Sequence, residues 1–208
     1  MSTVLLEKID NYSQKILILT CILGILALLF VCVGIGTPKW ESSYINTSGG
    51  SYTLSTTASF FYTCHFTNGI FNNCTSRTEN LTDYPRYSIS TRWMRDYHVR
   101  IQNAAALCTV AILFLAFALV ATVILIFHPL FAWINLASPI LFFVACLFMT
   151  AGMAEGSRYL LFNDYSANLY QTGHVLNILS LFSSAFATGR IHYFRKQEEE
   201  KLMKPIHK

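Results

Sequence analysis

Two cysteines in an aromatic-rich stretch are the residues with the clearest capacity for chemistry. Cys64 and Cys74 are separated by nine residues within the segment SFFYTCHFTNGIFNNCT, which runs from Ser59 to Thr75. Such a pair can form a disulfide in an oxidising compartment, remain as free thiols in a reducing one, or contribute to a metal site. No further His or Cys lies at ligand spacing, and His65 alone is a weak candidate, so we predict no metal site.

A polar helix face near the C-terminus is the other candidate for chemistry. This face comprises Gly173, Asn177, Ser180, Ser184 and Thr188. Spacings of three and four place these residues on one side of a helix, where small and polar side chains allow close helix packing in membranes. The alternative is a substrate or ion path with Gln171 and His174 at its mouth. No set of side chains forms a credible catalytic group, so we predict neither enzymatic activity nor a cofactor.

The composition is typical of an integral membrane protein. Of the 208 residues, 53% are hydrophobic and 12% are charged, whereas about 25% of the residues of a soluble domain are charged. The formal net charge is +4, and basic residues gather in the C-terminal tail. We attribute this excess to membrane topology and to contact with lipid headgroups. No basic stripe with interleaved aromatic residues is present in a soluble domain, so we predict no nucleic-acid partner.

Four apolar blocks predict four transmembrane helices, at residues 16–35, 104–127, 131–153 and 169–194. The first three have at least the roughly 20 residues needed to cross the hydrocarbon core, and none of them contains a charged residue. The fourth is more polar and includes Arg190. We predict that it also spans, because a fourth crossing returns the basic tail to the cytoplasm. The alternative is a re-entrant or interfacial helix.

The connections between these helices follow from the same topology. The expected cytoplasmic parts are residues 1–15, a tight turn at residues 128–130 and the basic tail at residues 195–208. The expected extracellular parts are a large loop at residues 36–103 and a second loop at residues 154–168. Sequons for N-glycosylation lie in the large loop, at Asn46, Asn73 and Asn80. Sequons and loop cysteines both favour the oxidising side, where Cys64 and Cys74 are expected to form a disulfide.

The large loop also has the pattern of a small antiparallel sheet. Its runs WESSYI, SYTLSTTASFFYTCHF and GIFNNCT are rich in aromatic and β-branched residues. The dipeptides Gly49-Gly50 and Asn68-Gly69 between them are hairpin signals. We expect three to five strands, a disulfide across the Asn68-Gly69 turn, and a short surface helix at SISTRWMRDYHVR. The predicted fold class is a membrane all-α four-helix transmembrane bundle with a small antiparallel extracellular β-sheet.

This arrangement resembles the four-transmembrane superfamily of claudins, peripheral myelin proteins, epithelial membrane proteins and clarins. The family pattern is a Trp after the first helix, then G-L-W-x-x-C, a second Cys eight to ten residues later, and an Arg near the start of the second helix. The residues of this chain that match it are Trp40, Phe60, Phe61, Cys64, Cys74 and Arg100, within GTPKW, SFFYTC and the segment before residue 104. Phe61 stands at the place of the second Trp.

The resemblance implies a structural role at the plasma membrane, with both termini in the cytoplasm. The expected function is cell–cell contact or junction organisation through the extracellular loops. The alternative is an auxiliary subunit that modulates the gating or trafficking of a channel or receptor. The expected partners are the lipid bilayer and other membrane proteins, through self-association or with such a channel or receptor. We further expect Phe61 to face down onto the helices, and Asn46 and Asn80 to be better sugar acceptors than Asn73, which adjoins a bridged cysteine.

Overall fold

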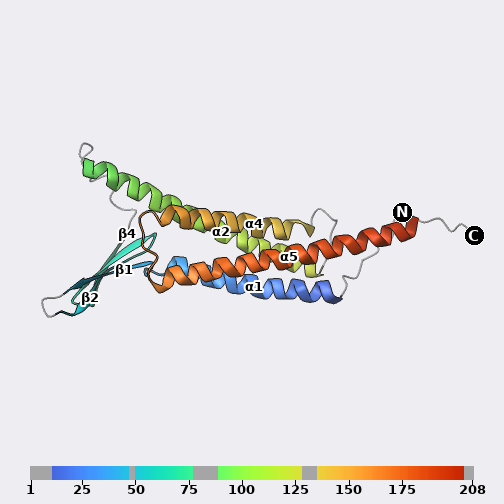
Figure 1. Ribbon diagram of the computed structural model, residues 1–208, viewed down its shortest axis with the longest axis horizontal. Helices are drawn as coiled ribbons and strands as arrows, with labels where there is room; N and C mark the ends of the chain where they lie inside the picture. The colour runs from blue at the N-terminus through green and yellow to red at the C-terminus, as the bar shows by residue number, and fades with distance from the viewer. Residues whose placement is uncertain (1–10, 47–49, 77–88, 128–134, 204–208) are drawn as a thin grey trace, which may run out of the picture.

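The computed structural model describes residues 11–46, 50–76, 89–127 and 135–203 (Figure 1). Four helices lie roughly along the long axis of the molecule, and a sheet projects from one end of them. The helices are α1 (Asn11–Gly36), α2 (Ile89–Phe127), α4 (Ala137–Gly156) and α5 (Tyr165–Met203). The strands are β1 (Glu41–Asn46), β2 (Tyr52–Ala58), β3 (Tyr62–Thr67) and β4 (Ile70–Ser76). The predicted turn at residues 128–130 lies outside the described residues.

Three of the described helices are long and apolar enough to cross a membrane. They are Asn11–Gly36, Asp96–Phe127 and Ala137–Gly156. Large apolar side chains on these helices remain exposed, as Leu29, Phe117 and Leu147 illustrate, and a helix that is apolar on its outer side is typical of a membrane span. The protein therefore has the features of a membrane protein built on a helical bundle.

The second helix is longer than the sequence predicts. The segment SISTRWMRDYHVR was expected to form a separate surface helix, but α2 runs without interruption from Ile89 to Phe127. Neither Gly nor Pro occurs within this range, so no residue supplies the usual signal for a helix to stop. The N-terminal part of α2 therefore extends beyond the bundle at the end where the sheet lies (Figure 1).

Close contact between α1 and α5 depends on glycine. A Cβ atom on Gly173 of α5 would lie 2.9 Å from the carbonyl oxygen of Ala27 and 3.0 Å from the backbone nitrogen of Val31. On the α1 side, a Cβ on Gly34 would lie 2.8 Å from the backbone nitrogen of Tyr170. The two backbones thus approach each other more closely than any larger residue permits, as small residues allow in membrane helices.

Replacement of Gly173 with alanine is therefore expected to destabilise the protein, by about 1–3 kcal/mol for an overpacked contact. Gly189 lies on the same helix, and a Cβ there would meet nothing within 4 Å. Because alanine has a higher helix propensity than glycine, Gly189→Ala is expected to be neutral or stabilising. Thermal unfolding of both variants in the same detergent tests this difference. Equal changes in the melting temperature of the two variants would contradict the prediction.

The sheet has four antiparallel strands in the order β1-β2-β3-β4. The hairpin between β3 and β4 closes at Asn68 and Gly69, with φ angles of 53° and 78°, and Thr67 pairs with Ile70 across it. Two consecutive positive φ angles define the turn that matches strand twist, and Asn-Gly is its preferred sequence. The expectation of a small sheet with a turn at Asn68-Gly69 is confirmed.

Candidate functional site

The sheet and its attachment to the helices contain most of the residues singled out in the sequence. Cys64 and Cys74 lie directly opposite each other on β3 and β4 and form a disulfide. Cys64 is buried, whereas Cys74 lies on a strand that is exposed from Ile70 to Thr75. The bridge therefore links the edge strand β4 to the inner strand β3, as the hairpin prediction requires.

Trp40 anchors the sheet on the helices. Its side chain is 0% exposed, and its ring centroid lies 4.4 Å from that of Phe60 and 5.2 Å from those of Phe162 and Tyr170. Its indole N–H donates a hydrogen bond of 2.7 Å to the carbonyl oxygen of Gly34, in the last turns of α1. One side chain thus contacts the sheet, the second loop, α1 and α5.

Of the two aromatic residues under the sheet, Phe60 is the more buried. Phe60 is 2% exposed and packs on Trp40, whereas Phe61 is only partly buried at the margin of the same cluster. Phe61 faces the helices as expected, because it packs against this cluster, but the expectation did not place Phe60 there as the more buried ring. That expectation assumed strand alternation through both residues, but β3 begins at Tyr62, so Phe60 and Phe61 lie in the turn between β2 and β3. The hydroxyl of Ser59 accepts hydrogen bonds from the N–H groups of Phe61 and Tyr62 in this turn.

The connection between α4 and α5 clamps the first strand. The side chain of Asn163 accepts a hydrogen bond of 2.9 Å from the Ser42 N–H and donates one of 3.1 Å to the Ser42 carbonyl. Ser42 also donates to the carboxylate of Asp164. The N–H of Leu161 donates to the carboxylate of Glu41, at 3.0 Å. The sheet is therefore held to the bundle by directional contacts as well as by the Trp40 cluster.

Arg100 joins α2 to α4 at the same end of the bundle. Its Nη1 donates to Glu155 at 2.9 Å, and its Nε lies 3.1 Å from the carboxylate of Asp96, one helical turn earlier. Tyr159 donates to Asp96, and this hydrogen bond raises the pKa of the phenol. Arg158 lies 3.8 Å from Glu155. The resemblance singled out Arg100, but the sequence did not indicate Asp96 and Tyr159 as members of the group.

The polar face predicted on the last helix lies against the other helices. All five of its residues are buried. Ser184 shares a hydrogen bond of 2.8 Å with Ser138 of α4, which shares one of 2.7 Å with Thr122 of α2. The Asn177 amide N–H donates to the sulfur of Cys146, at 3.1 Å, and Thr188 donates to the Asn135 carbonyl, at 3.3 Å. These contacts are the cross-helix hydrogen bonds expected of a packing face.

Ser138 is the central residue of this hydrogen-bond network, because its hydroxyl bonds to the hydroxyls of both Thr122 and Ser184. Ser138→Ala leaves the hydroxyls of Thr122 and Ser184 without their shared partner, and is expected to cost about 0.5–2 kcal/mol, the range of such bonds in membrane proteins. Ser157→Ala removes a hydroxyl that, among the described residues, bonds to the backbone carbonyl of Ala154 at an exposed helix end, and serves as the control. Chemical unfolding of the two variants in micelles measures the difference in their free energies of unfolding. Equal values would show that the hydrogen bonds of Ser138 do not stabilise the protein.

The sequons differ in what the structure says of them. Asn46 ends β1 and Asn73 lies on β4 opposite His65, and both are exposed. The bridge at Cys74 therefore does not bury Asn73, because the edge strand has no neighbour on its other side among the described residues. The expectation that Asn73 is a poor acceptor loses its steric reason. Asn80 lies outside the described residues.

The far end of the sheet carries large apolar side chains in solvent. We call this group the sheet tip, and it consists of Tyr44, Ile45, Tyr52, Ile70 and Phe71. Each of these side chains is at least 57% exposed, and Tyr52 reaches 73%. All lie on the half of the strands that points away from the helices (Figure 1). Successive strand residues point to opposite faces, so Tyr44 and Ile45 expose apolar side chains on both faces of this end of the sheet, as do Ile70 and Phe71. Exposed apolar side chains of this kind can mark sites of interaction, and no sequence signal distinguished them from the apolar residues that pack inward.

Comparison with known proteins finds no family model that matches the chain and no curated protein that matches it in sequence.

Proposed function

We propose that this protein is a four-span member of the claudin superfamily in the plasma membrane, where its sheet makes contacts in cell–cell contact or junction organisation. The observation that carries the proposal is the sheet tip, where large apolar side chains are exposed on both faces of the sheet at the end directed away from the bundle. A partner met at this surface lies above the membrane rather than beside the helices. That direction favours a contact made across the gap between two cells over a lateral contact with a channel.

A fourth span is part of this proposal. Helix α5 contacts both α1 and α4 and lies alongside α1 through the bundle (Figure 1). If α1 crosses the bilayer, the adjacent part of α5 lies at the same depth. Asn177, Ser180 and Ser184 in this part of α5 are buried, so these polar side chains face the bundle rather than the lipid.

The proposed orientation places the sheet outside and the ends of α1 and α5 in the cytoplasm. Arg190 lies at the end of the bundle opposite the sheet, with its guanidinium 4.7 Å from the ring centroid of Tyr12 and 4.8 Å from that of Phe194. Arg195 and Lys196 follow on the same helix. Basic residues on the cytoplasmic side and aromatic residues near the interface agree with this orientation, as do the exposed side chains of Asn46 and Asn73, the acceptor residues of two sequons.

The test is contact formation between cells that lack junctional strands of their own. Two populations that express the protein with different tags should accumulate both tags where they touch, and accumulation should fail against non-expressing cells. Tyr52→Glu and Ile70→Glu place charges in the sheet tip and should abolish this enrichment. Ser43→Glu, at an exposed position nearer the helices, should preserve it.

A uniform distribution at the contacts of expressing cells would overturn the proposed role. Co-purification of a stoichiometric channel or receptor from native membrane, insensitive to the tip variants, would instead favour an auxiliary subunit. Surface labelling and glycosidase treatment of each variant check that it reaches the plasma membrane, so that a loss of enrichment is not a loss of delivery.

A further inference from the structure

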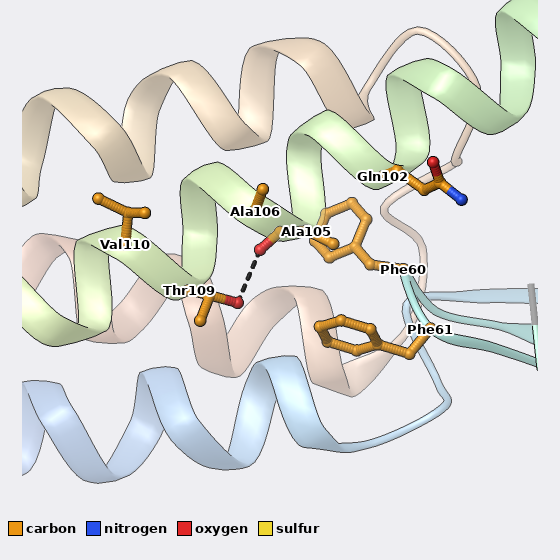
Figure 2. Close-up of a pocket in the computed structure, with 7 residues that line it drawn as sticks. All are labelled: Phe60, Phe61, Gln102, Ala105, Ala106, Thr109 and Val110. Atoms are coloured by element: carbon orange, nitrogen blue, oxygen red, sulfur yellow. Dashed lines mark hydrogen bonds between the residues drawn. The ribbon is translucent and has the colours of Figure 1, made fainter. Parts of the chain in front are cut away.

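A hollow lies where the turn between β2 and β3 meets α2. It has a volume of about 410 Å³ and is lined by Phe60, Phe61, Gln102, Ala105, Ala106, Thr109 and Val110. Figure 2 shows the two phenylalanine rings projecting from the sheet over the first turns of α2 that are free of charged residues. The space exists because Ala105, Ala106 and Thr109 are small, so that the helix surface under the rings is not filled.

The chemistry of the lining suits a hydrocarbon chain. No charged residue contributes to it, and Arg100, the nearest charge along α2 in the sequence, is already paired with Asp96 and Glu155. The Thr109 hydroxyl donates to the Ala105 carbonyl at 2.8 Å (Figure 2), so the helix itself satisfies it. The volume lies toward the lower end of the ~300–1,000 Å³ typical of small-ligand sites.

The hollow continues the lipid-facing surface of α2. Farther along this helix the exposed residues Leu113, Phe117, Val120 and Ile124 follow at spacings of three and four, which forms one apolar stripe. Ala106 is exposed at the position that begins this stripe. Because α2 is one of the apolar helices long enough to span a membrane, the surface that leads into the hollow is the one that acyl chains cover.

The polarity of the hollow changes along its length. Gln102 lies at the end nearest the sheet and Val110 at the opposite end (Figure 2). An amide at the interfacial end and apolar atoms deeper in the membrane match the orientation of a phospholipid. We propose that this hollow holds one acyl chain of a phospholipid from the leaflet on the side of the sheet. Gln102 would lie near the ester groups of the phospholipid, and the rings of Phe60 and Phe61 would cover the acyl chain.

A bound acyl chain would pack against one of the residues that attach the sheet to the helices. Phe60 lines the hollow and also packs on Trp40. An acyl chain that fills the hollow therefore holds the Phe60 ring in place against Trp40. The proposal requires only that α2 is embedded, and it does not depend on what the sheet tip binds.

The test uses the purified full-length chain and phosphatidylcholine as the probe. Native mass spectrometry after detergent washing should show one retained phosphatidylcholine per wild-type chain. Ala106→Trp places a large side chain in the hollow from an exposed position and should lose most of this retained lipid. Val120→Trp, on the same lipid-facing stripe but outside the hollow, should retain it.

A second measurement needs no variant and so does not depend on whether Ala106→Trp folds. The wild-type protein is placed in nanodiscs that contain phosphatidylcholine with a photoactivatable group on the acyl chain. The protein is then washed in detergent to remove the loosely bound lipid before illumination, and adducts should concentrate on the peptides that carry Phe60, Phe61 and Thr109 rather than on the one that carries Phe117. Absence of retained lipid together with uniform labelling would overturn the proposal. So would crosslinks from these residues to a second copy or to residues 77–88, because another occupant would then fill the hollow.

Discussion

Replacement of Trp40 with alanine is expected to lower the free energy of unfolding by about 3–5 kcal/mol, the usual cost of truncating a large buried aromatic side chain. The indole is fully buried between three aromatic rings, so little surrounding structure can collapse into the space. The Gly34 carbonyl also loses the hydrogen bond from the indole N–H. Thermal unfolding in detergent, followed by size-exclusion fluorescence, measures the change.

Two companion variants separate the contributions. Trp40→Phe keeps an aromatic ring in the cluster but removes the N–H donor, and is expected to cost less than the alanine variant. Tyr52→Ala truncates an aromatic residue that is 73% exposed, and should leave the melting temperature nearly unchanged. If Trp40→Ala is no more destabilising than Tyr52→Ala, Trp40 does not anchor the sheet.

Removal of the disulfide is expected to have the next largest effect. Serine at both Cys64 and Cys74 should destabilise the sheet by about 2–4 kcal/mol, the typical contribution of a disulfide. The edge strand β4 is exposed from Ile70 to Thr75 and has little apolar burial to hold it. The double variant should therefore release this hairpin, while the helices, which bury their own contacts, remain associated.

Limited proteolysis distinguishes local unfolding of the hairpin from global unfolding of the protein. Cleavage near the Asn68-Gly69 turn should accelerate in the double variant and in wild-type protein treated with reductant, with little change in helical circular dichroism. Cys32→Ser, at an exposed thiol on α1, is the control and should match the wild type. A double variant as resistant to cleavage as the wild type would show that strand pairing alone holds β4.

Features with a local physical cause were predictable from the sequence. Three apolar helices follow from hydropathy, because each segment of this kind must leave water whatever its neighbours are. The Asn68-Gly69 hairpin follows from backbone conformation, since both of its residues adopt positive φ. Direct pairing outward from that turn would set Cys64 opposite Asn73, and a β-bulge between His65 and Phe66 shifts the register by one residue, so that Cys64 lies opposite Cys74. Each conclusion depends on residues close together in the chain.

The sequence-based predictions were incomplete or wrong where a local pattern was compatible with two structures. The apolar pair Phe60 and Phe61 was compatible with a strand through both residues, which directs only one ring to the helices, or with a turn. The structure has a turn, because β3 begins at Tyr62, and both rings line the hollow against α2. The segment before residue 104 was polar enough to suggest a separate helix, although it contains no residue that ends one. A break in polarity is a weaker signal than a break in backbone geometry, and α2 continues through it.

The sequence by itself determined the apolar helices, the antiparallel hairpin and the cysteines that can bridge it. Only the tertiary structure decided that Trp40 meets Gly34, Phe60 and Tyr170, that Arg100 binds Glu155, and that a hollow remains beneath the aromatic turn. The physical reason is separation along the chain. Hydropathy and turn propensity act on neighbouring residues, whereas close packing joins residues whose relation depends on how all the helices and the sheet fit together.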